Sequence, residues 1–232
     1  MSEKSNVTKE WIEGAWAKYP PKKLENGNIV FGPVRLAFVN LVGEQKKTKA
    51  GNLKSWGAVL LFPDCADLKL LKTEATAKLK EKAPLALTNK AIAEKYHNPF
   101  KKQDSFVDTK TGNLYEGFVE GRTAISMNSP GSQPPVVNQR LAPVIDEKSC
   151  YSGVWAMVTA SPCSWFKVDG NEGPNFYLQS VMIVQDDESL GGSGSSNPNK
   201  DFEGINLSSD VNPAAAFGAA DTNGEEPVDI FA

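Results

Sequence analysis

The stretch from Tyr151 to Val184 decides the fold. It reads Tyr151-Ser-Gly-Val-Trp-Ala-Met-Val-Thr-Ala160, then a loop, then Phe176-Tyr-Leu-Gln-Ser-Val-Met-Ile-Val184. Both runs are typical of strands, and Gly, Pro and Asn residues punctuate the loop between them. Side chains alternate along a strand, so one face of the first run is uniformly apolar and consists of Val154, Ala156, Val158 and Ala160. Trp155 and Met157 lie on the other face, which is either a second buried face or a platform on which nucleic-acid bases stack.

Length and composition predict one domain with appendages, because the chain has 232 residues and 40% of them are apolar. No apolar run is long enough to span a membrane, and the first residues lack the pattern of a signal peptide. We therefore expect a cytoplasmic protein that makes no membrane contact.

The residue types that commonly carry catalysis are scattered along the sequence. The cysteines Cys65, Cys150 and Cys163 have no metal-binding spacing, and free thiols in a reducing compartment fit them best. His97 is the one histidine of the sequence and lies in a Lys-rich segment, which argues against a zinc site or a His-based triad. We expect no catalytic residue, no metal and no cofactor.

Charge is divided unevenly along the chain. Residues 186–232 contain ten acidic residues and one lysine, a net charge of −9, whereas residues 1–185 contain 24 basic and 18 acidic residues, a net charge of +6. A Gly/Ser-rich linker follows Leu190, and the rest of the tail is poor in large apolar residues, which predicts disorder. Such opposed halves indicate a body that attracts polyanions and a tail that resembles one.

Strand patterns dominate the body of the chain. The strand from Ile29 to Val42 would present three apolar side chains on one face: Val34, Leu36 and Phe38. A loop with four lysines in residues 46–54 follows this strand, and this charge favours contact with phosphates. The other expected elements are helices at Thr8–Lys18, Asp64–Lys82 and Ala86–Tyr96, and strands at Ser55–Phe62, Asn113–Asn128, Pro135–Val137 and Ala142–Ile145.

These elements predict a mainly β protein, and many short strands with one main inserted helix favour an oligonucleotide-binding (OB) fold. An OB-fold is a five-stranded Greek-key barrel, here with extra strands, whose strand face and loops hold nucleic acid. The predicted organisation is an N-terminal extension at 1–28, the OB domain at 29–188, and a linker with a disordered acidic tail at 189–232.

Four segments, taken in order, carry a resemblance to a known family. They are Val34–Phe38 before the Lys-rich loop and the strand end Leu60–Pro63, Tyr151–Pro162, Leu178–Val184 before the Gly-rich linker, and the acidic tail with its aromatic near the end. In this arrangement the chain resembles the phage single-stranded DNA-binding proteins, the group that includes the T-seven-type replication protein and its relatives in other tailed phages. The resemblance implies an OB-fold, sequence-independent binding of single-stranded DNA in replication and recombination, and a tail that recruits replication proteins such as polymerase and helicase–primase.

Binding single strands requires aromatic faces for the bases and cations for the backbone. The aromatic candidates are Trp155, Trp165, Phe166, Trp56, Phe106 and Tyr115. The cationic candidates are Arg35, Lys54, Lys101, Lys102, Arg122, Arg140 and Lys167. In the tail, Asp229, Ile230 and Phe231 form an apolar anchor flanked by charge that would bind partners, and the tail would compete with DNA for the basic body.

A different hypothesis for the same sequence is a structural β-domain of a virion or interaction protein that binds no nucleic acid. The two hypotheses differ in whether oligo(dT) quenches the emission of the five tryptophans.

Overall fold

The computed structural model describes residues 7–47, 50–129, 131–168 and 171–190. It begins with α1 (Lys9–Lys18), where the Thr8 side chain caps the helix by accepting from the Trp11 N–H at 3.2 Å. This agrees with the helix predicted at the N-terminus. Among the described residues, no helix is long and apolar enough to cross a membrane.

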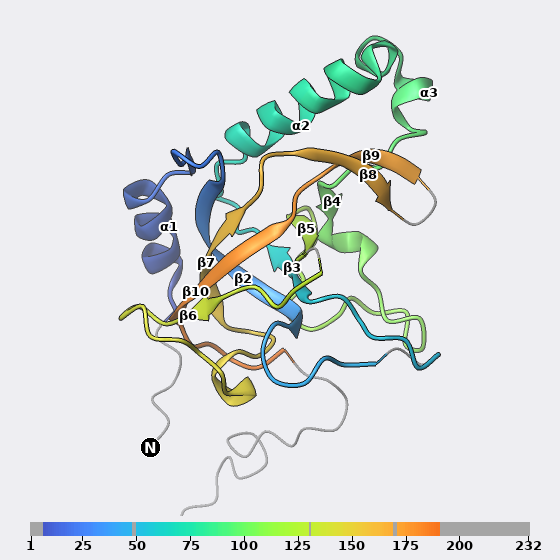
Figure 1. Cartoon of the computed structure of the whole chain (residues 1–232). Helices are drawn as coiled ribbons and strands as arrows, with labels where there is room; N and C mark the ends of the chain where they lie inside the picture. The colour runs from blue at the N-terminus through green and yellow to red at the C-terminus, as the bar shows by residue number, and fades with distance from the viewer. Residues whose placement is uncertain (1–6, 48–49, 130, 169–170, 191–232) are drawn as a thin grey trace, which may run out of the picture. The chain divides into compact units, whose positions relative to one another are not determined.

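Five strands form a barrel: β2 (Ile29–Asn40), β3 (Gly57–Leu61), β5 (Thr123–Asn128), β7 (Trp155–Ala160) and β10 (Leu178–Gln185). In the sheet β2 lies between β3 and β7, β5 follows β3, and β10 follows β7, all in antiparallel pairs (Figure 1). A parallel bridge between Asn128, at the end of β5, and Tyr177, just before β10, closes the circle. A five-stranded barrel with these connections is an OB-fold, so the predicted fold class is confirmed.

Alternate side chains of these strands fill the barrel interior. Val154, just before β7, and Ala156, Val158 and Ala160 within it are at most 1% exposed, and so are Phe31, Leu36 and Leu60 from β2 and β3. The helix α1 packs on β2, because Trp16 is buried and its indole N–H donates to the Pro33 carbonyl oxygen at 2.9 Å. One continuous core therefore holds the barrel and the helix together.

The main helix, α2 (Lys69–Lys82), lies in sequence between β3 and β5 and starts later than predicted. Leu68 is its N-cap residue and gives no side-chain cap, while Asp67 Oδ1 accepts from the Lys69 N–H at 2.9 Å. The helix contacts β8 (Ser164–Val168) and β9 (Asn171–Asn175), an antiparallel hairpin within the loop that connects β7 to β10. The sequence patterns did not predict this hairpin.

The strand predicted at Asn113–Asn128 was wrong over its first ten residues, since β5 begins at Thr123. Gly117 and Gly121 have φ angles of 81° and 79°, which belong to turns rather than strands. The segment before β5 is therefore a loop that crosses the outside of the barrel.

Two shorter elements are less extensive than predicted. The helix expected at Ala86–Tyr96 is a 3₁₀ turn at Pro84–Leu87 followed by the short α3 (Lys90–Ala93). The strand expected at Ala142–Ile145 is reduced to a bridge between Val137 and Pro143. The remaining elements are β1 (Lys22–Lys23), β4 (Lys101–Lys102), β6 (Val136–Val137) and 3₁₀ turns at Gln103–Ser105 and Glu147–Ser149.

Candidate nucleic-acid interface

A second apolar cluster lies on the outer face of β2, β3 and β5. Alternate residues of these strands turn outward here, and the cluster consists of Ala37, Val59, Leu61, Ala124 and the buried ring of Phe118. Phe106 and Tyr115, both predicted to stack on bases, are half-buried and pack against it. We call Phe38, Phe106, Tyr115 and Phe118 the outer aromatic cluster. It covers the strand face that an OB-fold uses for nucleic acid.

Phe38 is the most exposed ring of the outer aromatic cluster, with 49% of its surface accessible. The ring lies edge-on to Tyr115, with centroids 4.9 Å apart, and 5.7 Å from Phe118. The alternation along β2 put Phe38 on one face with Val34 and Leu36, but those two side chains are fully buried and Phe38 is not. The β2–β3 register shifts between Ala37 and Asn40, and Phe38 adopts a φ of 50°, which turns the ring outward.

Such a backbone conformation is strained for a bulky side chain, and strained positions gather at functional sites. The exposed ring of Phe38 is thus a candidate stacking residue that the sequence patterns missed.

The basic loop between β2 and β3 starts beside Phe38. Lys46 Nζ donates to the Val39 carbonyl oxygen at 3.1 Å, which holds this lysine against the strand. Gln45 Nε2 donates to the Lys54 carbonyl oxygen at 2.7 Å, so the two ends of the loop are joined while the Lys54 side chain stays exposed. Trp56, half-buried, immediately precedes β3. The loop therefore holds the Lys46 ammonium against the β2 backbone, one residue beyond Phe38, and leaves the Lys54 side chain exposed.

Trp155 and Arg35 lie on the same outer face but are covered. Trp155 is 6% exposed, and its indole N–H donates to Asp187 Oδ2 at 2.8 Å. Arg35 Nη2 lies 3.3 Å from the same carboxylate oxygen and donates to the Glu188 carbonyl oxygen at 2.9 Å. The structure brings these two candidates together, but in a closed contact with residues that follow β10.

Three further cationic candidates gather at the other end of β5. Lys101 and Lys102 form β4, which pairs with Ala124 and Thr123, and both are exposed. Arg122 forms a two-point ion pair with Asp64, in which Nε donates at 3.0 Å and Nη2 at 2.6 Å. The lysines are open to a ligand in this structure, whereas the guanidinium already has a carboxylate partner.

The β8–β9 hairpin carries three more candidates. Trp165 is half-buried, with its ring 5.4 Å from that of Tyr96, and Lys167 is exposed. Phe166 belongs to β8, and its side chain lies outside the described part of the chain. The backbone N–H of His97 donates to the Glu172 carbonyl oxygen at 2.8 Å, which fastens the hairpin to the segment after α3. This hairpin connects the fourth and fifth barrel strands and is the second loop that OB-folds use for binding.

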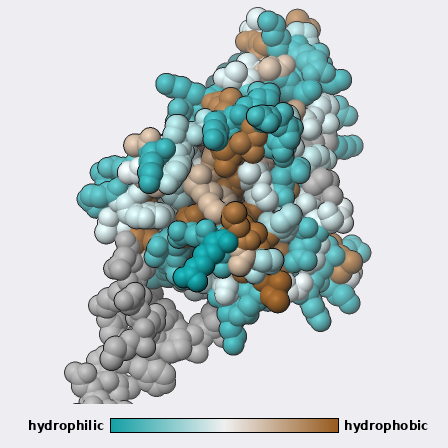
Figure 2. All heavy atoms as spheres, turned by 60° about the vertical axis from the view of Figure 1, so that its left-hand side comes forward, coloured by the Kyte–Doolittle hydropathy of each residue, from teal (hydrophilic) through white to brown (hydrophobic). Residues whose placement is uncertain are grey.

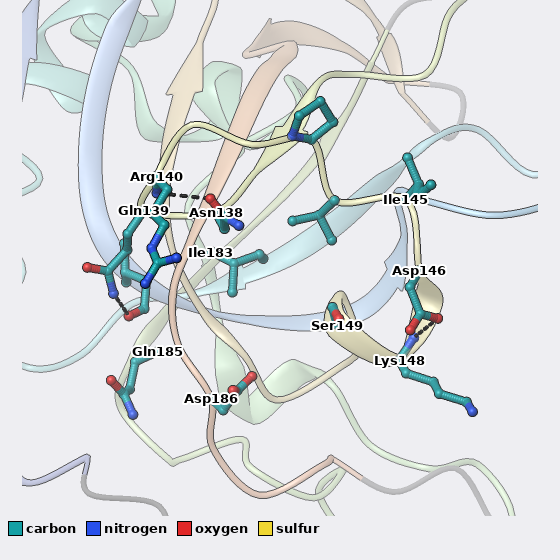
Figure 3. A pocket seen from close by; sticks show the side chains of 13 residues that line it. Asn138, Gln139, Arg140, Ile145, Asp146, Lys148, Ser149, Ile183, Gln185 and Asp186 are labelled. Carbon is teal, nitrogen blue, oxygen red and sulfur yellow. Dashed lines mark hydrogen bonds between the residues drawn. The ribbon is translucent and has the colours of Figure 1, made fainter.

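Arg140 lies apart from these residues, in an open groove of about 930 Å³ that is floored by the end of β10. Figure 3 shows Arg140 and Lys148 at opposite ends of the groove, with the acidic side chains of Asp146 and Asp186 near it. Mixed charge in the groove gives it no preference for a polyanion.

Figure 2 shows the left-hand side of Figure 1, where hydrophobic surface is gathered centrally between hydrophilic flanks.

Metal binding and thiol attack find little support among the described residues. They contain no group of three His, Cys, Asp or Glu side chains that could hold a metal ion. All three cysteines are free, as predicted, and burial raises the pKa of the Cys150 and Cys163 thiols to about 12. Thiols protonated at neutral pH are poor nucleophiles.

Comparison with known proteins gives a family for this chain. The family described as the single-stranded DNA-binding protein of Enterobacter phage Enc34 matches residues 27–212. The chain belongs to this family. The resemblance inferred from the order of the segments is therefore confirmed, and the family's role is one of binding rather than catalysis.

Two solved structures with TM-scores above 0.5 agree on the fold. The Enc34 single-stranded DNA-binding protein in complex with single-stranded DNA has 19% identity and a TM-score of 0.55, over 82% of this chain and 100% of that one. Its C-terminal truncation has 19% identity and a TM-score of 0.54, over 82% and 99%. The single-stranded DNA-binding protein gp2.5 of bacteriophage T7 has 11% identity, covers 73% and 98%, and has a TM-score of 0.44. Curated protein sequences gave no match.

The predicted partner-binding residues Asp229, Ile230 and Phe231, and the linker and tail from residue 191 onward, lie outside the described residues.

Proposed function

We propose that the protein binds single-stranded DNA without sequence preference, coats it during phage replication and recombination, and acts in the cytoplasm of the infected cell. The observation that carries the proposal is the outer aromatic cluster, with the half-exposed ring of Phe38 beside a lysine-rich loop. Each base stacked on an aromatic ring contributes about 1–3 kcal/mol by alanine substitution. Paired bases hide their faces, so exposed rings favour unpaired strands.

The strand would pass between the two loops that flank the barrel face. Phe38, Tyr115 and Trp56 would receive bases at the loop between β2 and β3, where the Lys54 side chain is exposed. The exposed residues Lys101 and Lys102 would pair with phosphates along β4. At the far loop, the hairpin would supply its own ring and cation: Trp165 and Lys167. Backbone contacts of this kind carry no sequence information, which accounts for binding without sequence preference.

A fluorescence titration of the full chain with oligo(dT) tests the proposal. The Phe38→Ala variant should bind about tenfold more weakly, since one stacked base is lost. Tyr19→Ala is a matched control, because Tyr19 is a half-exposed ring at the end of α1, with 50% of its surface accessible. An affinity equal to that for duplex DNA, or a Phe38→Ala variant that binds like Tyr19→Ala, would contradict the proposal. No quenching at all would favour a structural β-domain without nucleic-acid binding.

The acidic tail is proposed to bind replication proteins through Asp229, Ile230 and Phe231 and to compete with DNA for the basic body. The support is charge alone, since residues 186–232 have a net charge of −9. A chain that ends at Leu190 should bind oligo(dT) more tightly than the full chain at low salt, and the difference should shrink as salt is added. Equal affinities of the two chains would argue that the tail does not compete.

A further inference from the structure

Residues 186–190, which follow β10, run over the outer face of the barrel and are fastened there by polar contacts. We call them the strap. The Tyr151 hydroxyl donates to the Asp187 carbonyl oxygen at 2.8 Å, and the Leu190 N–H donates to the Ser152 carbonyl oxygen at 2.7 Å. Gly153 leaves room for this path, because a Cβ there would collide with the Glu188 backbone. The strap is thus a built contact rather than a loose end.

The side chain of Asp187 occupies a small cationic site. One of its carboxylate oxygens receives the Trp155 indole N–H at 2.8 Å and lies 3.3 Å from Arg35 Nη2. The side chains of Arg35 and Asp187 are only 18% and 14% exposed. Arg35 Nε also donates to the Gly153 carbonyl oxygen at 3.1 Å, which fixes the direction of the guanidinium. An oriented guanidinium and an indole N–H converge on one anionic oxygen.

These donors suit a phosphate as well as a carboxylate. Arginine forms charge-assisted hydrogen bonds with both groups, and an indole offers a donor and a stacking face together. The sequence of the strap, Asp186-Asp187-Glu188, places three negative charges in a row, as a DNA backbone does.

The strap also touches the proposed binding face. Leu190 packs against the same apolar cluster of β2, β3 and β5, which includes Phe118, as Tyr115 and Phe106 do. Its side chain also fills the space that a Cβ on Gly117 would need. A strand that stacks on Tyr115 would therefore meet the strap at Leu190. Its next contacts along the same face would be Arg35 and Trp155, once the strap has left.

We propose that Arg35 and Trp155 form a further phosphate-binding site for single-stranded DNA, which the strap occupies through Asp187 until a DNA phosphate replaces that carboxylate. The inference rests on the proposed DNA-binding function. It assigns a role to Asp187, and it reconciles the predicted DNA contacts of Arg35 and Trp155 with their covered positions.

The test compares the full-length variants Asp187→Ala and Glu188→Ala in a titration with oligo(dT). Both variants lose one carboxylate from the strap, but the structure gives only that of Asp187 a contact with Arg35; Glu188 reaches Arg35 through its backbone oxygen. Asp187→Ala should bind on the order of tenfold more tightly than the wild type, as expected when a competing internal ligand is removed. Glu188→Ala should bind within about twofold of the wild type, because its charge is exposed and screened.

Hydrogen exchange of the wild-type chain provides a second measurement that does not depend on the stability of a variant. Exchange of the Leu190 amide, which is bonded to Ser152, should speed up when oligo(dT) is added. Equal affinities of the two variants, or unchanged or slower exchange at Leu190 in the DNA complex, would overturn the inference while leaving DNA binding intact. A full chain that does not bind oligo(dT) would overturn the proposed function and this inference with it.

Discussion

The inner and outer faces of β2 carry the same residue type in opposite situations. Phe31 is fully buried and stacks on Phe62 with a centroid distance of 5.8 Å, whereas Phe38, seven positions later, is half exposed beside Tyr115. The inner ring belongs to the closed core of the barrel. The outer ring has neighbours on one side and solvent on the other. The difference separates residues that hold the barrel together from residues left available to a ligand.

The largest expected effect is on stability and concerns the inner ring. Phe31→Ala should lower the free energy of unfolding by about 3–5 kcal/mol, because it leaves a cavity in a closed core. Phe38→Ala, the same change on the same strand, should cost less than about 1 kcal/mol, since most of the lost contacts are replaced by water. Urea denaturation of both variants measures the two values.

Similar losses for the two variants would break the comparison. In that case the outer aromatic cluster would be a second core that stabilises the domain. Phe38 would then be a structural residue rather than one that stacks on a DNA base.

The two faces also differ in how well the sequence predicts them. The inner face of β7 was predicted residue by residue, because its apolar pattern is uninterrupted. A shift of one residue in the strand pairing would turn all of these apolar side chains to the outside, so their burial fixes the register. Phe38 escaped prediction, since its outward turn depends on the shifted pairing between β2 and β3, which a local pattern does not encode. Trp155 was correctly placed on the face opposite Val154 and Ala156, but Asp187, whose carboxylate accepts its indole N–H, lies 32 positions further along the chain. Contacts between distant segments decide which outer side chains stay open.

The next effect concerns the β8–β9 hairpin, which the sequence also missed. A Cβ on Gly173 would lie 2.5 Å from the His97 carbonyl oxygen, so Gly173→Ala should push the hairpin away from the segment after α3. We expect about 1–3 kcal/mol of lost stability, as in other overpacked sites, and weaker binding of oligo(dT). Gly14→Ala is the control, because nothing lies within 4 Å of a Cβ there and α1 should gain stability. Unchanged DNA affinity in Gly173→Ala would exclude the hairpin from the interface.

A smaller effect distinguishes the basic loop from the lysines of α2. Replacing Lys47 and Lys54 together by Gln should reduce the slope of log affinity against log salt by about 1.4, since each phosphate contact on a single strand contributes about 0.7. The matched variant replaces Lys72 and Lys80, two exposed residues of α2. Its slope should stay within error of the wild type. If the helix variant changes the slope and the loop variant does not, the strand passes over α2 instead.

The smallest effect is a labelling rate that reports on the two faces separately. Cys150 and Cys163 belong to the inner core, where burial raises the pKa of their thiols to about 12, so at pH 8 both are protonated as well as shielded. Cys65 is exposed and should react first with a thiol reagent, although partial burial raises its pKa too. Because a buried thiol reacts only when the fold opens, Phe31→Ala should speed the labelling of Cys150 and Cys163 in proportion to its lost stability. Phe38→Ala should leave their labelling unchanged, and faster labelling there would mean that the outer ring also keeps the core closed.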